Sequence, residues 1–328
     1  MKKPSPIIRF MLRTALFALI VGCLLGAGEW AVRRYVPNPY RTKAERMEHG
    51  PMPRSIVLGN SHSYYGVRPD MLPAPAVSLA NVSQPLAYDL ELLRHYEALG
   101  RLDSLRFIVA QVSFTSLFDK DFEDTPEWYR CINYKLYMGL DRHPALSRYG
   151  FELARPGVYG AKLKSLAGIG EAALLCDSLG FGLGYTRERR GEAWASNGAD
   201  IAAYHNAGAD TTRVAANIAV LDSIVAIGRR HGAMTLLFTQ PEWTTYRSAA
   251  DPAKLALMQR SMKDFAATHG VTWLDLYDDP RFGADDFYDA DHLNTDGATR
   301  LTRLLAERIR AEEAAATSPK QQPQVPTQ

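Results

Sequence analysis

The stretch SIVLGNSHS, residues 55–63, guides the interpretation of the whole chain. Its first four residues form a short apolar run closed by Gly59, a pattern typical of a buried β-strand. Polar residues 60–63 follow where that strand ends. In a parallel sheet the carboxyl end of a strand faces the ligand crevice, so Ser61 is expected at a site. Simple capping of a helix by Asn60, Ser61 and Ser63 is the alternative interpretation.

Short apolar runs recur along the chain. Four more apolar runs are predicted strands, at residues 76–79, 106–112, 234–238 and 271–276. Helical spacing lies between and after them, at residues 88–99, 214–228, 252–268 and from about 296, where Asn294 or Thr295 is a candidate cap. Continuous apolar strands that alternate with helices predict an α/β fold, a doubly wound parallel sheet of about five strands.

This alternation breaks between residues 119 and 205. The segment has no clear strand and is rich in aromatic residues and arginine. We interpret it as a helical insertion that covers the sheet as a lid. Cys131 and Cys176 both fall inside it. In an oxidising compartment they are candidates for a disulfide, and two unpaired buried thiols are the alternative.

The N-terminal residues 1–34 form a candidate membrane anchor. Residues 14–28 carry no charge, and the apolar stretch continued through Val32 is about 19 residues long, roughly 29 Å as a helix. Basic residues precede it: Lys2, Lys3, Arg9 and Arg13. We expect an uncleaved anchor with the bulk of the chain outside. A signal peptide cut near Gly26 and Gly28, a lipoprotein signal at Cys23 and a buried core helix remain alternatives.

The C-terminal residues 313–328 contain almost no large apolar side chain and predict a disordered tail. The remainder, residues 53–312, is long enough for one α/β domain with its own core.

Composition excludes several classes of protein. The 328 residues carry 38 basic and 36 acidic side chains, a net charge of +2, so we expect no nucleic-acid partner. An apolar fraction of 46% argues against a disordered chain. No Cys-x-x-Cys pair or Cys/His cluster predicts zinc, and we expect no cofactor.

A second polar segment, FYDADHLNTDG at residues 287–297, lies between the fifth predicted strand and the last helix. A serine hydroxyl needs a neighbouring base, for which histidine is suited, and the base needs a carboxylate to orient it. Asp289 and His292 are three residues apart and supply both. A helix-capping loop that binds a cation through Asp289, Asp291, Asn294 and Asp296 is the alternative; we expect no metal.

The G-x-S element after the first strand and the D-x-x-H element before the last helix together resemble the SGNH/GDSL hydrolase superfamily, over about residues 53–310. Within it the chain most resembles a membrane-anchored envelope branch, which includes the teichoic-acid D-alanine transfer protein and the alginate O-acetylation proteins. The resemblance implies a flavodoxin-like fold, with Ser61 as nucleophile and Asp289 and His292 as its partners.

Two family features are missing from the sequence. The oxyanion-hole glycine after the second strand and the asparagine after the third strand have no counterpart here. The candidate oxyanion or substrate contacts that remain are Asn60, His62, Asn81, Ser83 and Ser113. For His62 an ordinary polar turn position is the favoured interpretation.

The resemblance therefore implies a serine esterase or O-acyltransferase. It would act on acyl esters of a cell-envelope glycan from the bacterial inner membrane, with a single-pass anchor and the main domain facing the periplasm or exterior. The envelope polysaccharide, an acyl donor and the membrane are the expected partners. The alternatives are a catalytically inactive polysaccharide-binding or assembly protein on the same fold, and a cation-dependent enzyme.

Overall fold

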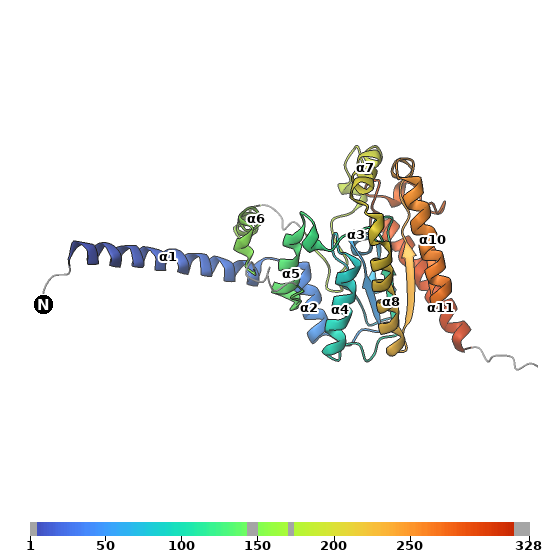
Figure 1. Cartoon of the computed structure of the whole chain (residues 1–328), viewed down its shortest axis with the longest axis horizontal. Coiled ribbons are helices and arrows are strands. Elements are labelled where there is room, and N and C mark those ends of the chain that lie inside the picture. The colour runs from blue at the N-terminus through green and yellow to red at the C-terminus, as the bar shows by residue number, and fades with distance from the viewer. Residues whose placement is uncertain (1–4, 143–149, 170–173, 318–328) are drawn as a thin grey trace, which may run out of the picture.

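The computed structural model describes residues 5–142, 150–169 and 174–317 (Figure 1). Its centre is one sheet of five parallel strands in the order β2-β1-β3-β4-β5. The strands are β1 (Ser55–Leu58), β2 (Ala76–Ser78), β3 (Phe107–Gln111), β4 (Met234–Thr239) and β5 (Thr272–Asp275). The predicted five-stranded α/β fold is confirmed, and the strand order is that of flavodoxin-like sheets.

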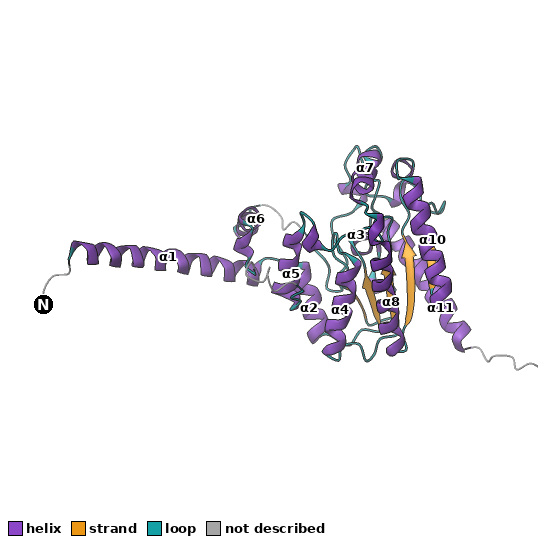
Figure 2. Cartoon of the chain, in the orientation of Figure 1, coloured by secondary structure: helices purple, strands orange, loops and turns teal. Residues whose placement is uncertain are grey.

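Helices cover both faces of the sheet, as Figure 2 shows. On one face Ile56, Ile108 and Leu237 pack with α4 (Leu86–Ala98), α8 (Val214–Arg230) and α10 (Pro252–His269). On the other face Val57 and Val109 pack with α11 (Thr295–Thr317). Successive strand residues point to opposite faces, so a strand buried on both sides is mostly apolar, as Ile56, Val57 and Leu58 are.

The remaining described elements are shorter. The α-helices are α2 (Pro39–His49), α3 (Ser61–Gly66), α5 (Cys131–Met138), α6 (Pro156–Leu166), α7 (Gly198–Gly208) and α9 (Thr244–Arg247). The 3-10 turns are η1 (Pro69–Met71), η2 (Phe122–Asp124), η3 (Trp128–Arg130), η5 (Glu152–Ala154), η6 (Arg187–Arg189), η7 (Thr211–Arg213) and η8 (Ala284–Asp286).

The N-terminal helix α1 (Pro6–Tyr35) projects away from the sheet (Figure 1). None of its most apolar window is buried, and its length and hydropathy suffice to cross a membrane. The segment Thr211–Arg230 passes the same test, but it contains α8, which packs on the sheet. A membrane anchor at the N-terminus is therefore consistent with the structure.

The folded body begins earlier than the expected residue 53. Helix α2 buries Tyr40, Lys43 and Met47 against the sheet and its loops. The sequence PYRTKAERMEH is so rich in charge that it has no obvious apolar face, which is why the pattern did not predict a core helix.

The expected tail at residues 313–328 also requires a correction, since α11 continues to Thr317. Glutamate and alanine at residues 312–316 are strong helix formers. Glu312 also contacts Thr272 at the end of the sheet and Arg308 one turn earlier, which ties this part of the helix to the body. Residues 318–328 lie outside the described part of the chain.

The insertion after β3 is helical, with α5, α6 and α7 in its described parts. Helix α7 ends at Gly208, slightly beyond the expected limit of 205. Cys131 and Cys176 are free thiols, each with other neighbours: Cys131 contacts the hydroxyl of Tyr88, and Cys176 lies on the aromatic cluster of Tyr64 and Tyr65.

Gly59 makes the turn that carries the chain from β1 into α3. Its φ is +125°, a conformation that favours glycine. A Cβ at this position would lie 2.9 Å from Ser63 Oγ and 3.0 Å from the side chain of Gln111. The Gly59 N–H donates to the buried carboxyl of Asp89 at 2.9 Å. The turn therefore places Asn60 and Ser61 at the carboxyl edge of the sheet.

Candidate active site

Ser61 is the first residue of α3, directly after β1, and His292 lies in the loop between η8 and α11. Nε2 of His292 is 2.9 Å from Oγ of Ser61. Nδ1 of the same ring is 3.0 Å and 3.2 Å from the two carboxylate oxygens of Asp289. The two segments singled out in the sequence thus meet at the edge of the sheet, in one chain of hydrogen bonds.

The loop that carries Asp289 and His292 is internally braced. Oδ1 of Asp289 accepts the backbone N–H groups of Asp291 and His292 at 2.8 Å and 2.7 Å. Oδ1 of Asn294 accepts those of Asp296 and Gly297, so Asn294, one of the two expected caps, caps α11. The carboxylate and the ring are therefore held by backbone contacts as well as by each other.

Charge in this loop favours an ionised Asp289 and a basic His292. Burial alone would raise the pKa of Asp289, but the charge of His292 outweighs it and holds that pKa below its usual range. Burial would lower the pKa of His292, but the carboxylates of Asp289 and Asp291 outweigh it and raise the pKa to about 9. The ring consequently binds its proton more tightly than an ordinary histidine does.

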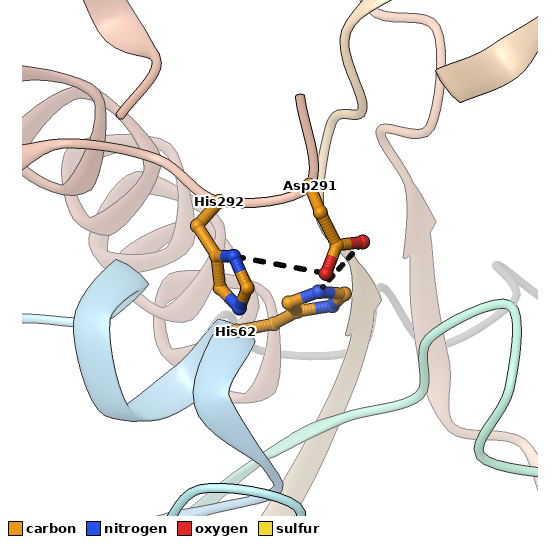
Figure 3. Close-up of side chains that lie close together, drawn as sticks. All are labelled: His62, Asp291 and His292. Atoms are coloured by element: carbon orange, nitrogen blue, oxygen red, sulfur yellow. Dashed lines mark ion pairs between the residues drawn. The ribbon is translucent and has the colours of Figure 1, made fainter. Parts of the chain in front are cut away.

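A second polar cluster lies beside the first (Figure 3). His62 is buried, and its Nε2 is 3.3 Å from Oδ1 of Asp291, whose other oxygen is 3.7 Å from Nδ1 of His292. Glu242, after β4, is 3.9 Å from His62 Nδ1. Burial raises the pKa of Glu242 well above its usual value, and the charges of Asp291 and Asp289 raise it further. His62 therefore lies among the buried polar groups beside His292, and its part as a substrate contact stays a prediction.

The insertion completes the walls of the site. Tyr185 stacks between Tyr65 and Tyr288, with ring centroids 3.6 Å and 3.9 Å apart, and its edge faces His292 at 5.3 Å. From α7, His205 contributes a ring whose Nδ1 is 2.8 Å from the hydroxyl of Tyr246 and 4.0 Å from Asp291. Tyr185 therefore covers one side of the His292 ring, and His205 brings a further ring to Asp291.

A cavity of about 420 Å³ opens onto Ser61. Two parts of the insertion form much of its wall: a segment within residues 119–127, and residues 204–208 of α7. Of the expected oxyanion or substrate contacts, Asn60, His62 and Ser83 line this cavity. Ser83 is exposed and has a φ of +59°.

Asn81 and Ser113 are placed differently from the expectation. The Asn81 amide donates to Leu79 and Gln84, and its oxygen accepts from the buried ammonium of Lys43 at 2.9 Å. Ser113 contacts Thr115 and Ser116 and accepts from Asn60 Nδ2 at 3.3 Å. Both are buried, and neither is among the residues that line the cavity. Ser113 therefore contacts the cavity wall indirectly, through Asn60 and Thr115, which both line it.

Sequence reasoning did not single out Glu242, His205 or Tyr185 as site residues. Glu242 had a usable signal, because it follows a predicted strand whose carboxyl end faces the crevice. His205 and Tyr185 had none, since they reach the site from an insertion whose course over the sheet the sequence pattern does not determine.

Three potential metal ligands lie close together among the described residues. His62, Asp291 and His292 each offer an atom within 4.8 Å of the others. The alternative of a cation-binding loop is not supported by the contacts of Asp289 and Asn294, because Oδ1 of each accepts two backbone N–H groups.

Comparisons with known proteins find no related sequence, and they find solved structures that match at low identity. No protein-family model matches the sequence, and no curated protein matches it. Among solved structures, a GDSL-like lipase from Bacteroides thetaiotaomicron aligns with 84% of this chain and all of its own, at 11% identity and a TM-score of 0.40. A lipase/acylhydrolase from Enterococcus faecalis aligns with 82% of this chain and all of its own, at 12% identity and a TM-score of 0.37.

Proposed function

We propose that this protein is a serine esterase or O-acyltransferase with the triad Ser61, His292 and Asp289. The observation that supports it most strongly is the continuous chain of contacts from Ser61 Oγ through both nitrogens of His292 to Asp289. A nucleophile, a base and an orienting carboxylate within hydrogen-bond reach are what acyl transfer requires. The flavodoxin-like strand order and the two motifs fit the SGNH/GDSL resemblance.

In the proposed reaction, Oγ of Ser61 attacks the carbonyl carbon of an acyl ester while Nε2 of His292 takes the hydroxyl proton. Asp289 holds the ring and stabilises its positive charge. The tetrahedral intermediate collapses, the alcohol leaves, and His292 returns the proton to it. The acyl group on Ser61 then passes to water or to another hydroxyl, which makes the reaction hydrolysis or transfer.

Asn60 and Ser83 are the proposed donors to the oxyanion. Both line the cavity beside Ser61, whereas Asn81 hydrogen-bonds to Gln84 and Ser113 to Ser116. One amide N–H of Asn60 donates to Ser113, which fixes the side chain and leaves the other N–H for substrate. The αL backbone of Ser83 replaces the glycine that the family usually has after the second strand.

We further propose that the substrate is an acylated glycan of the bacterial envelope. The cavity wall combines hydroxyl and carboxyl side chains with two aromatic rings, one buried and one exposed: Thr115, Asp119, Asp124, Thr125, Phe122 and Tyr204. Such groups suit sugar hydroxyls better than an acyl chain. With α1 in the inner membrane as a single anchor, the domain would face the periplasm or exterior, where that polymer and an acyl donor are found.

Turnover of an acetylated glycan and of an aryl acetate, by wild type and by Ser61→Ala and His292→Ala, tests this proposal. We expect ester cleavage or acyl transfer in the wild type and its loss in both variants. The alternative, a binding or assembly protein without turnover, predicts no cleavage by the wild type and glycan binding that survives both substitutions.

A further inference from the structure

Aromatic and basic residues gather in the last two turns of α1. Trp30 and Tyr35 are 60% and 59% exposed and meet edge to face with ring centroids 5.5 Å apart. Arg33 and Arg34 lie in the same turns. Tryptophan and tyrosine concentrate where a bilayer meets water, with basic residues beyond the apolar core. The last two turns of α1 therefore have the composition of a membrane–water boundary.

The insertion contacts α1 close to these last two turns. The Glu29 carboxylate accepts the backbone N–H groups of Glu152 and Leu153 at 2.8 Å and 3.1 Å. Val32 packs against Tyr159 of α6 in a small buried cluster. The hydroxyl of Tyr159 lies so close to Gly28 that a Cβ there would collide with it. Helix α6 thus packs beside the end of α1 (Figure 1).

Helix α6 and its flanks expose apolar side chains that no described core residue covers. Leu163, Leu166 and Ile169 recur every three residues and are 38%, 37% and 65% exposed, and Phe151 is 53% exposed. We call these four residues the α6 patch. Behind α6 lies a cavity of about 290 Å³, lined in part by Phe151 and Lys162, so the helix does not close the core tightly. Core packing therefore does not account for these apolar residues.

Charge near the α6 patch suits an anionic surface. Lys164 is exposed on α6, and Arg34 is exposed at the end of α1. Arg155 covers the ring of Tyr129 and has no ion pair with a carboxylate among the described residues. Exposed apolar residues with lysine and arginine around them are typical of a helix that lies in the bilayer interface.

We propose that the α6 patch is a second membrane contact, seated in the headgroup region of the same bilayer that α1 spans. This inference rests on the proposed role of α1 as an anchor. The contact would hold the domain in one orientation against the membrane, with the insertion on the bilayer side, and would fix the height of the Ser61 cavity above the lipid surface.

Site-specific labelling of the full chain tests it. An environment-sensitive fluorophore is attached to a single cysteine at Leu166 or at Ile169, in a background with Cys23, Cys131 and Cys176 changed to serine. The protein is reconstituted in vesicles of phosphatidylethanolamine and phosphatidylglycerol that carry nitroxide-labelled lipid. A second protein, which keeps native Cys23 and lacks only Cys131 and Cys176, carries the label within α1 and reports on the anchor. Ser223→Cys on α8, in the background without native cysteines, is the matched control at a partly exposed position outside the α6 patch.

We expect blue-shifted emission and several-fold stronger nitroxide quenching at positions 166 and 169 than at 223, together with quenching at Cys23. Quenching at Cys23, with quenching at positions 166 and 169 no stronger than at 223, would contradict the second contact but would still support the anchor. No quenching at any of these positions would overturn the anchor and the second contact together.

Discussion

Nε2 of His292 lies 2.9 Å from Oγ of Ser61, although the residues are 231 positions apart in the chain. Parallel strands bring this about, because β1 ends at the same edge of the sheet at which the loop before α11 arrives. Asp289 then lies within 3.0 Å of the other ring nitrogen. The proposed function depends on this contact and on the turn at Gly59 that supports it.

Asp289→Asn is expected to lower kcat by on the order of 10³–10⁴ with little change in fold, because the amide no longer stabilises the imidazolium or selects its tautomer. Steady-state hydrolysis of an aryl acetate measures this. Asp296→Asn, in the first turn of α11, removes the same charge from an exposed position seven residues away and is the matched control. Equal effects of the two substitutions would count against the role of Asp289.

We expect kcat/KM to increase as the pH is raised from neutral towards 9. The pKa of His292 is raised to about 9 by Asp289 and Asp291 against the opposing effect of burial, and only the neutral ring takes the Ser61 proton. Asp291→Asn removes one of these charges, so the rising limb should move to lower pH. Asp285→Asn, an exposed carboxylate paired with Arg187, is the control. A limb that Asp291→Asn leaves in place would contradict this electrostatic assignment.

Removal of divalent cations with EDTA is expected to leave activity unchanged. His62, Asp291 and His292 offer three ligand atoms, but both ring nitrogens of His292 are already engaged by Ser61 and Asp289. Rates measured before and after chelation provide the test. Activity lost with EDTA and restored by Zn²⁺ would instead place a metal at these three residues.

Gly59→Ala is expected to destabilise the fold by about 1–3 kcal/mol, because an alanine at φ +125° is strained and its Cβ meets Ser63 and Gln111. Urea denaturation of the full chain in detergent measures this loss. Gly100→Ala, at φ +66° with open space around it, is a control for backbone strain alone. If Gly59→Ala is as stable as Gly100→Ala, the contact of its Cβ with Ser63 and Gln111 is contradicted.

Much of the fold was predictable because both sheet faces are buried. A strand covered on both sides is mostly apolar, so β1, β3 and β4 are visible as continuous runs. The meeting of Ser61 with the loop of Asp289 and His292 follows from the same topology, since ends of parallel strands share an edge.

The errors have a common physical origin. Helix α2 has no apolar stripe, and the ammonium of its buried Lys43 depends on long-range contacts with Ala80, Asn81 and the ring of Tyr64. Burial lowers the pKa of this lysine to about 7. Because α2 was not predicted, Asn81 was expected to face the crevice, whereas it serves Lys43 and Gln84. Side chains that converge from separate elements, such as Tyr185 and His205, depend on an insertion path that sequence periodicity does not specify.

Covalent labelling tests most directly whether Ser61 is an activated nucleophile. The full chain is treated with a fluorophosphonate and the modified peptide is mapped by mass spectrometry. Ser63→Ala, two residues away with its hydroxyl on the Leu58 carbonyl, is the matched control. We expect one adduct, on Ser61, retained in Ser63→Ala and lost in Ser61→Ala and His292→Ala. Undiminished labelling of Ser61→Ala, or no labelling of the wild type, would contradict the role of Ser61 as the nucleophile.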